Sequence, residues 1–242
     1  MIRTVCVWTC IVICTLVLGT LAFMTFLFDR RGRLIHCYAR LWGWLILKVN
    51  GVKVQVLGLE YIDKKKPSIY MCNHQGTFDI FTLLAYLPLQ FRWVAKVGIF
   101  RIPILGWAMS TAGYISLDRS KRKRAYQGME IAAQKIKEGT SVVIFPEGSR
   151  SFDGALQPFM NGGFTLALKA GAPIVPITID GSWHIMPRTT LRIKNGNIQL
   201  VIQRPIETKN LTMKDRKQLM RKVKKKVRLN LTPPARRHTD AT

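Results

Sequence analysis

Acidic residues are scarce in this chain of 242 residues, because 13 Asp and Glu stand against 38 Lys and Arg and leave a formal net charge of +25. Such an excess of positive charge implies an anionic partner, which could be nucleic acid, acidic lipid or a phosphorylated substrate. Zinc-finger spacing, RNP motifs and a basic zipper are absent, so we expect no specific nucleic-acid partner. Six Trp and a hydrophobic share of 48% favour a lipid surface instead.

The sequence also lacks the motifs of metal centres and of covalent catalysis. The five cysteines are odd in number and do not occur in close pairs, which argues against a disulfide framework. Cys6, Cys10 and Cys14 recur every four residues in an apolar segment without a His or carboxylate beside them, so packing or lipid contact competes there with metal ligation. HExxH, CxxC, P-loop and GxSxG patterns are missing. We therefore expect no metal and no cofactor, and no serine-dependent lipid esterase.

The N-terminal region is strongly apolar. Thr4 to Phe28 carries no charge, and about 20 apolar residues suffice to cross a bilayer. The heavier positive flank, Asp29–Arg33, follows this stretch and predicts that the chain after it is cytoplasmic. A second apolar segment, Leu34–Val49, is too short to span, and its Trp42 and Trp44 suit the headgroup level. A full span and a two-helix hairpin in one leaflet are both compatible with this pattern.

From Val52 onward, short apolar runs alternate with helical segments, which predicts an α/β fold with a sheet flanked by helices. Asn195-Gly196 between two apolar runs, 191–194 and 198–202, predicts a β-hairpin. The expected organisation is an N-terminal membrane segment at 1–50, an α/β domain at 51–208, and a basic C-terminal helix with a tail at 209–242. The expected strands are 52–56, 69–72, 92–95, 113–117, 141–145 and 174–179, and the expected helices are 80–87, 103–111, 121–137 and 164–170.

The C-terminal region combines a helix start signal with a run of positive charge. Thr212–Asp215 resembles a capping box with Asp in place of Glu. In the helix that follows, Leu219, Val223 and Val227 form one narrow apolar stripe. The basic residues around this stripe are either a solvated helix face or a surface for acidic lipid.

His74 and Asp79 are the first candidates for chemistry. They follow the apolar run Ile69–Cys72, and five residues correspond to about 500° on an ideal helix, so the two would not share a helix face. The pair makes sense if His74 lies in a turn after a strand and Asp79 near the start of the next helix. There a carboxylate can bond one imidazole nitrogen and leave the other free as a base. The alternative is that Asp79 only caps the helix.

Glu147 and Arg150 are the second candidates, in the polar turn after the buried-type run Val142–Phe145. Parallel α/β sheets bind ligands beyond the carboxyl ends of their strands. We therefore expect this turn and His74 to meet at one edge of the sheet. The alternative is a local ion pair between Glu147 and Arg150 in a tight turn.

Four blocks of the sequence resemble the motifs of the glycerolipid acyltransferase family, and they occur in the family's order over about residues 68 to 182. The blocks are Asn73–Asp79, Lys96–Gly106 continuing to Gly113–Arg119, Phe145–Arg150, and Val175–Ile177. The nearest likeness is to the bacterial members that acylate 1-acyl-glycerol 3-phosphate, and those members carry a two-helix membrane motif at the N-terminus. The chain departs from the family at Val97 and Gly98, where many members have a second Lys or another polar residue.

The resemblance implies transfer of an acyl chain from acyl-CoA or acyl carrier protein to the sn-2 hydroxyl of lysophosphatidic acid, which gives phosphatidic acid. It also implies an anionic phospholipid membrane as partner, namely the bacterial cytoplasmic (inner) membrane, with the catalytic domain on its cytoplasmic face. Acylation of another lysolipid or of glycerol 3-phosphate is an alternative. A basic membrane-surface protein without catalysis would explain the charge equally well, but not the motifs.

Each candidate residue then has an expected role. His74 acts as general base, and Asp79 orients it and stabilises the imidazolium. Arg150 binds the acceptor phosphate bidentately and Lys96 binds it as a point charge. Glu147 positions Arg150 or the glycerol backbone. Three further residues belong to the expected site: Gly148, which permits a tight turn, and Arg101 and Arg119, which are either phosphate ligands or ordinary surface residues.

Overall fold

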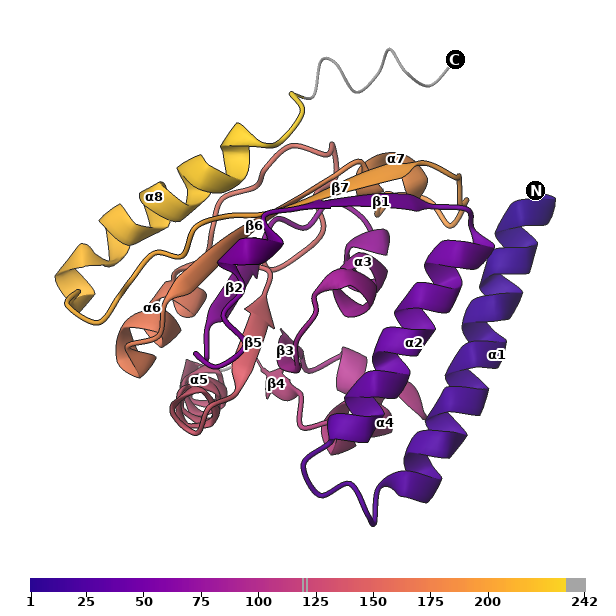
Figure 1. Ribbon diagram of the computed structural model, residues 1–242, viewed down its shortest axis with the longest axis horizontal. Helices are drawn as coiled ribbons and strands as arrows, with labels where there is room; N and C mark the ends of the chain where they lie inside the picture. Colours follow the sequence, from indigo (N-terminus) through magenta and orange to yellow (C-terminus); the bar gives the residue numbers. More distant parts are fainter. Residues whose placement is uncertain (119, 121, 234–242) are drawn as a thin grey trace.

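The computed structural model describes residues 1–118, 120 and 122–233. In these residues seven strands form one sheet in the order β1-β7-β6-β2-β5-β3-β4 (Figure 1). The strands are β1 (Lys53–Leu57), β2 (Ile69–Cys72), β3 (Phe91–Lys96), β4 (Ile115–Leu117), β5 (Ser141–Ile144), β6 (Ile174–Asp180) and β7 (Asn197–Ile202).

Strand direction determines where the site forms. β6, β2, β5, β3 and β4 are mutually parallel, so their carboxyl ends lie at one edge of the sheet. β7 pairs antiparallel with β6, and β1 pairs parallel with β7. The sheet is therefore mixed, and the predicted α/β fold is confirmed.

Helices cover both faces of this sheet. α1, α2 and α3 pack on one face, where Tyr70 and Phe78 are fully buried, and α5, α6 and α8 pack on the other, where Phe164 and Val223 are fully buried (Figure 1). The α-helices are α1 (Ile2–Thr25), α2 (Arg33–Val49), α3 (Phe78–Tyr86), α4 (Leu105–Thr111), α5 (Arg122–Lys137), α6 (Asn161–Ala170), α7 (Ser182–Ile185) and α8 (Arg216–Leu229). Short 3₁₀ helices are η1 (Leu59–Tyr61), η2 (Ile99–Arg101) and η3 (Met213–Asp215).

α1 and α2 account for the apolar N-terminus in different ways. Within the described residues α1 is the one helix that is long and apolar enough to cross a membrane, and its outward face exposes residues such as Val12 and Phe23. α2 instead buries Ile46 and Leu47 in the core beside α3. Gly43 permits this approach, because a Cβ there would lie 2.9 Å from a backbone oxygen of α3. The second apolar segment is thus an amphipathic helix packed on the α/β fold.

The predicted hairpin around Asn195-Gly196 is wrong. β7 follows this turn, but 191–194 is not a strand, and β7 pairs with β1 and β6 instead. The backbone of 191–194 is bonded to the N-terminal helices, because Ile193 N–H donates to Thr4 Oγ1 and Asn50 Nδ2 donates to the Lys194 carbonyl. These partners are distant in sequence, so the local turn signal could not reveal them.

Other predicted elements are present with shifted ends. α3 begins at Phe78 rather than at residue 80, so Asp79 lies inside its first turn. α6 begins three residues earlier than expected, and α4 begins two residues later. The capping box is confirmed, since Asp215 Oδ2 accepts from Thr212 N–H at 2.8 Å. The predicted apolar stripe of α8 is buried, and the expected tail from residue 234 onward lies outside the described residues.

Candidate active site

His74 and Asp79 meet at the carboxyl end of β2. His74 Nδ1 lies 2.8 Å from Asp79 Oδ2, and Asp79 is fully buried in the first turn of α3. The same Oδ2 accepts from the backbone N–H of Gln75 at 2.7 Å and of Gly76 at 3.0 Å. Asp79 therefore both caps the turn and bonds the imidazole. Because a carboxylate only accepts, we assign the imidazole proton to Nδ1, which leaves Nε2 as the basic nitrogen.

Residues of the turn after β5 hold the ring plane and the backbone of His74. Its ring stacks on Phe145 with centroids 3.9 Å apart and an interplanar angle of 9°. Its backbone N–H donates to Glu147 Oε1 at 2.6 Å, and its carbonyl accepts from Ser151 N–H at 2.8 Å. The ring plane and the backbone of His74 are thus held by the 145–151 turn, which the sequence motifs predicted to lie nearby.

Glu147 supports the backbone of the site, and its observed partners differ from the expected ones. Its second oxygen accepts from Gln157 N–H at 2.7 Å, so one carboxylate joins two separate loops. Burial raises the pKa of Glu147 to about 8, although both N–H donors favour the ionised form. Among the described residues Glu147 and Arg150 form no ion pair, so the alternative of a local ion pair in this turn is not observed. Arg150 Nη1 donates to Thr77 Oγ1 at 2.5 Å instead.

The remaining predicted residues separate into two groups. Gly148 (φ 77°) and Lys96, at the end of β3, line the same cavity as His74 and Arg150. Arg101 is exposed on η2 and does not line this cavity. Arg119 lies outside the described residues. The structure therefore brings Lys96, Gly148 and Arg150 to His74 and leaves Arg101 apart.

Arg188 is a cavity residue that the sequence analysis did not identify. Its guanidinium carbon lies 4.2 Å above the ring of Phe152, and the neighbouring Pro187 forms a β-bridge with Gly76 in the His74 turn. Burial is the main cause that lowers the pKa of Arg150, and the positive charge of Arg188 lowers it further. Within the described part of the chain no carboxylate forms an ion pair with either arginine. Arg188 lies after the last family motif in the sequence. Its closeness to Val175–Ile177 along the chain is the one signal that could have identified it as a site residue.

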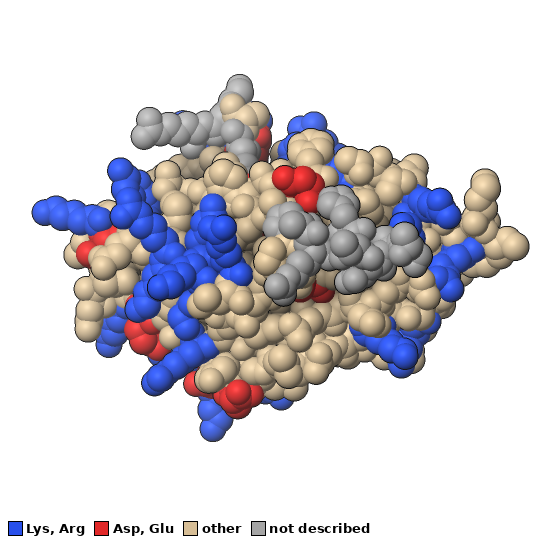
Figure 2. All heavy atoms as spheres, turned by 90° about the horizontal axis from the view of Figure 1, so that it is seen from above, with Lys and Arg blue, Asp and Glu red and all other residues tan. Residues whose placement is uncertain are grey.

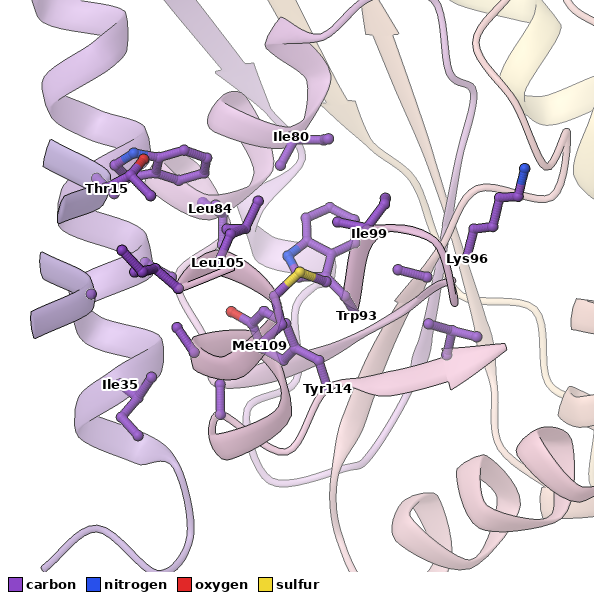
Figure 3. Close-up of a pocket in the computed structure, with 18 of the residues that line it drawn as sticks. Thr15, Ile35, Ile80, Leu84, Trp93, Lys96, Ile99, Leu105, Met109 and Tyr114 are labelled. Atoms are coloured by element: carbon purple, nitrogen blue, oxygen red, sulfur yellow. The ribbon is translucent and has the colours of Figure 1, made fainter. Parts of the chain in front are cut away.

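A cavity of 410 Å³ extends from these polar groups into an apolar region formed by α1, α2, α3, α4 and β3 (Figure 3). This volume lies in the range of small-molecule sites. Lys96 extends away from the apolar side chains at one side of the cavity (Figure 3). Representative apolar lining residues are Ile35, Leu84, Trp93, Leu105 and Met109.

The arrangement has a definite chemical capacity. One end of the cavity offers a basic nitrogen on His74 and the guanidinium groups of Arg150 and Arg188, while the other end is apolar. Such a site can bind an amphiphile with an anionic headgroup and an alkyl chain, and it can accept a proton from a hydroxyl near His74. No cluster of three or more His, Cys, Asp or Glu side chains arranged to hold a metal ion occurs among the described residues.

The fold and the site together define an α/β protein with a His–Asp pair at the carboxyl edge of its sheet, and comparison with known families agrees. The family model described as Acyltransferase matches residues 53–180, more than half of the chain. The chain belongs to this family.

Individual relatives are similar over much of the chain. A chloroplast 1-acyl-sn-glycerol-3-phosphate acyltransferase of Brassica napus is 40% identical over 183 residues, which are 74% of this chain and 53% of the relative. The human 1-acyl-sn-glycerol-3-phosphate acyltransferase alpha is 31% identical over 68% of this chain and 59% of its own length. The chain thus spans about half the length of the first curated relatives it matches.

A solved structure is similar over nearly the whole chain. The crystal structure of the 1-acyl-sn-glycerophosphate (LPA) acyltransferase PlsC from Thermotoga maritima has a TM-score of 0.79 and is 25% identical. The match covers 94% of this chain and 94% of the other. It extends beyond the Acyltransferase segment of residues 53–180.

Proposed function

We propose that this protein transfers an acyl chain from a thioester donor to the sn-2 hydroxyl of lysophosphatidic acid and so forms phosphatidic acid. The observation that carries the proposal is that His74, whose Nδ1 is held by Asp79, lines one largely apolar cavity together with Arg150 and Arg188. The names of the relatives in Brassica napus, in human and in Thermotoga maritima support the same acceptor.

In the proposed step, His74 Nε2 takes the proton of the acceptor hydroxyl as its oxygen attacks the thioester carbonyl carbon. A C–O bond forms, the C–S bond breaks, and the thiolate leaves with the proton that His74 returns. Asp79 stabilises the transient imidazolium, as the carboxylate of a catalytic triad does. A thioester is already activated, so the step needs no covalent acyl-enzyme and no cofactor. The donor is acyl-CoA or acyl carrier protein.

The acceptor fits the two ends of the cavity. Its phosphate binds Arg150 and Arg188, because guanidinium groups match phosphate geometry bidentately. Lys96 adds a point charge at the rim. The alkyl chain of the acceptor lies among the apolar residues of α1, α2 and α4, where it is removed from water. Because α1 contributes to this wall, the cavity adjoins the helix that exposes an apolar face.

The apolar outer face of α1 supports attachment to a phospholipid membrane. We place the α/β domain on the cytoplasmic face, since Arg30, Arg31 and Arg33 follow α1 and positive residues stay on that side. The bacterial cytoplasmic membrane is the proposed location. An acceptor that resides in the leaflet would then enter the cavity along α1.

Arg150→Ala should lower kcat/KM for lysophosphatidic acid by the contribution of a charge-assisted contact, about 1.5–3 kcal/mol. The kcat/KM of the variant for the acceptor 1-monoacylglycerol, which lacks the phosphate, should fall much less. Rates for the two acceptors, measured in parallel with purified protein in detergent, test this. Arg101→Ala is the matched control, because Arg101 is exposed and does not line the cavity. A loss of the same size with both acceptors would remove Arg150 from the phosphate site.

Lysophosphatidylcholine and glycerol 3-phosphate complete the acceptor series that tests the proposed function. Lysophosphatidic acid should give the highest kcat/KM, because it alone combines a phosphate monoester with an alkyl chain. Preference for lysophosphatidylcholine would assign the site to a different lysolipid. Preference for glycerol 3-phosphate would mean that the apolar cavity does not hold the acceptor's chain.

High salt should not release the full-length protein from phospholipid vesicles, since attachment through α1 is apolar and is not screened. Replacing Val12, Leu16 and Phe23 together by Ser should shift much of the protein to the supernatant, because each side chain contributes about 1.5–3 kcal/mol when buried. These residues are 53%, 48% and 63% exposed in the structure. Sedimentation of both proteins with vesicles measures the effect.

The matched control replaces three exposed apolar residues elsewhere by Ser, namely Leu59, Ile131 and Leu229. This control should sediment like the unaltered protein. If the α1 variant also stays with the vesicles while salt releases both proteins, the attachment is electrostatic and α1 is not the anchor.

A further inference from the structure

The solvent face of α8 is strongly basic. Its exposed basic residues are Lys217, Arg221, Lys222, Lys225 and Arg228, with Lys224 and Lys226 half-exposed beside them, and the helix contains no Asp or Glu. None of them takes part in an ion pair among the described residues. Figure 2 shows Lys and Arg gathered at the left of the molecule, on the side where Figure 1 places α8. We call this surface the α8 basic face.

The buried side of α8 holds the helix rigidly in this position. Leu219, Val223 and Val227 are at most 3% exposed and pack on the core beside α6 and β6. Arg221 and Lys225, four residues apart, lie opposite this apolar stripe and are exposed. The charges are thus presented by a fixed scaffold, which suits a specific partner better than a frayed tail would.

The C-terminal half of α8 lies at the catalytic edge of the sheet. Thr178 of β6 donates to the Val227 carbonyl at 2.8 Å, and Thr232 N–H donates to Asp180 at the carboxyl end of β6. Lys224 lies 5.8 Å above the ring of Phe159, in the segment that follows the Glu147–Gln157 loop. A molecule bound to the α8 basic face is therefore next to the loop that holds His74.

The α8 basic face also lies on the opposite side of the sheet from the apolar N-terminus. α1 and α2 cover the α3 face, whereas α8 covers the α6 face (Figure 1). A leaflet that receives the outward side of α1 would lie at the far end of the molecule from α8. Of the two alternatives left open by the sequence, adherence to acidic lipid is therefore disfavoured. A helix face with this charge also attracts acidic proteins.

We propose that the α8 basic face docks an acidic protein that carries the acyl chain as a thioester, so that the donor approaches the site from the side away from the membrane. The inference rests on the proposed acyl transfer. It gives the two substrates separate routes, because the lipid acceptor enters along α1 and the carrier docks beside the Glu147–Gln157 loop. Charge complementarity of this kind mainly raises the rate of association and the specificity for the partner.

The test compares two donors with one charge-reversal variant. Arg221→Glu/Lys225→Glu should lower kcat/KM for acylated acyl carrier protein by about tenfold or more at low ionic strength, because electrostatic steering contributes that much to association. With acyl-CoA, which needs no protein surface, the change should be less than about twofold by the same reasoning. Added salt should reduce the difference between the variant and the unaltered protein.

The matched control is Lys64→Glu/Lys65→Glu, which changes the net charge equally. Lys64 and Lys65 are exposed in the loop before β2, at the opposite edge of the sheet from His74. The control should keep its activity with both donors. Equal losses with both donors in the α8 variant, or an equal loss with the carrier in the control, would overturn the docking surface. Reduced sedimentation of the α8 variant with anionic vesicles would assign the α8 basic face to lipid instead.

Direct binding keeps this inference separate from the proposed reaction. Full-length protein in detergent should bind acyl carrier protein without an acyl chain, and Arg221→Glu/Lys225→Glu should weaken this binding about tenfold. If neither donor supports transfer by the unaltered protein but the charge-dependent binding persists, the proposed function fails and the docking surface stands. If transfer proceeds and the carrier binds both proteins equally, the docking surface fails alone.

Discussion

His74→Ala is expected to lower the rate of acyl transfer about 10²–10⁴-fold, because it removes the general base that accepts the hydroxyl proton. The structure supports a loss of this size for a geometric reason. Nδ1 is bound to Asp79, the ring is stacked on Phe145 and the backbone N–H is bonded to Glu147, so Nε2 is presented in one orientation. The assay is initial-rate acyl transfer by purified protein with saturating donor and acceptor.

His184→Ala is the control for His74→Ala. His184 lies on α7 and does not line the cavity, so its replacement should leave the rate largely unchanged. Thermal unfolding of both variants should resemble that of the unaltered protein, because the His74 side chain lines the cavity and is not a member of the buried hydrophobic clusters. A His74→Ala protein that keeps more than about a tenth of the rate would show that this histidine is not the base.

Asp79→Asn should have an effect of similar size, on the order of 10³–10⁴-fold, as expected when the carboxylate of a His–Asp pair becomes an amide. The amide can donate to Nδ1 and so favours the tautomer whose Nε2 carries the proton. It also cannot stabilise the imidazolium by charge. Rate measurement across pH is the readout, since a changed tautomer lowers the rate over the whole range.

Asp63→Asn is the control carboxylate, because Asp63 is exposed in the loop before β2. Asp79 also accepts from two backbone N–H groups, so the variant's melting temperature should be measured alongside the rate. Full activity of a correctly folded Asp79→Asn protein would reduce Asp79 to a helix cap, which was the alternative open at the level of sequence. Loss of activity together with loss of folding would instead make its role structural.

Short-range patterns predicted much of the site. A strand exit followed by a helix start determines how His74 meets Asp79, and both signals lie within a dozen residues of sequence. The position of the Phe145–Arg150 turn beside His74 was also predictable. The carboxyl ends of parallel strands gather at one edge of a sheet. The buried stripe of α8 followed from its helical periodicity.

Contacts between distant segments could not be predicted in this way. Glu147 bonds His74 and Gln157 rather than Arg150, and nothing in the local sequence of the turn specifies those partners. Arg188 lines the cavity, and its neighbour Pro187 pairs with Gly76 across more than a hundred residues. The hairpin prediction failed for a related reason, since the chain before β7 is bonded to the N-terminal helices.

Acyl transfer to lysophosphatidic acid is tested by following the acyl chain itself. Purified full-length protein would be given lysophosphatidic acid and an isotopically labelled acyl-CoA, and product and free thiol would be quantified together by mass spectrometry and a thiol assay. Acyl transfer to the sn-2 hydroxyl should give labelled phosphatidic acid with the new chain at the sn-2 position and one free thiol for each molecule formed. Thiol release with free fatty acid and no phosphatidic acid, or neither product, would contradict it.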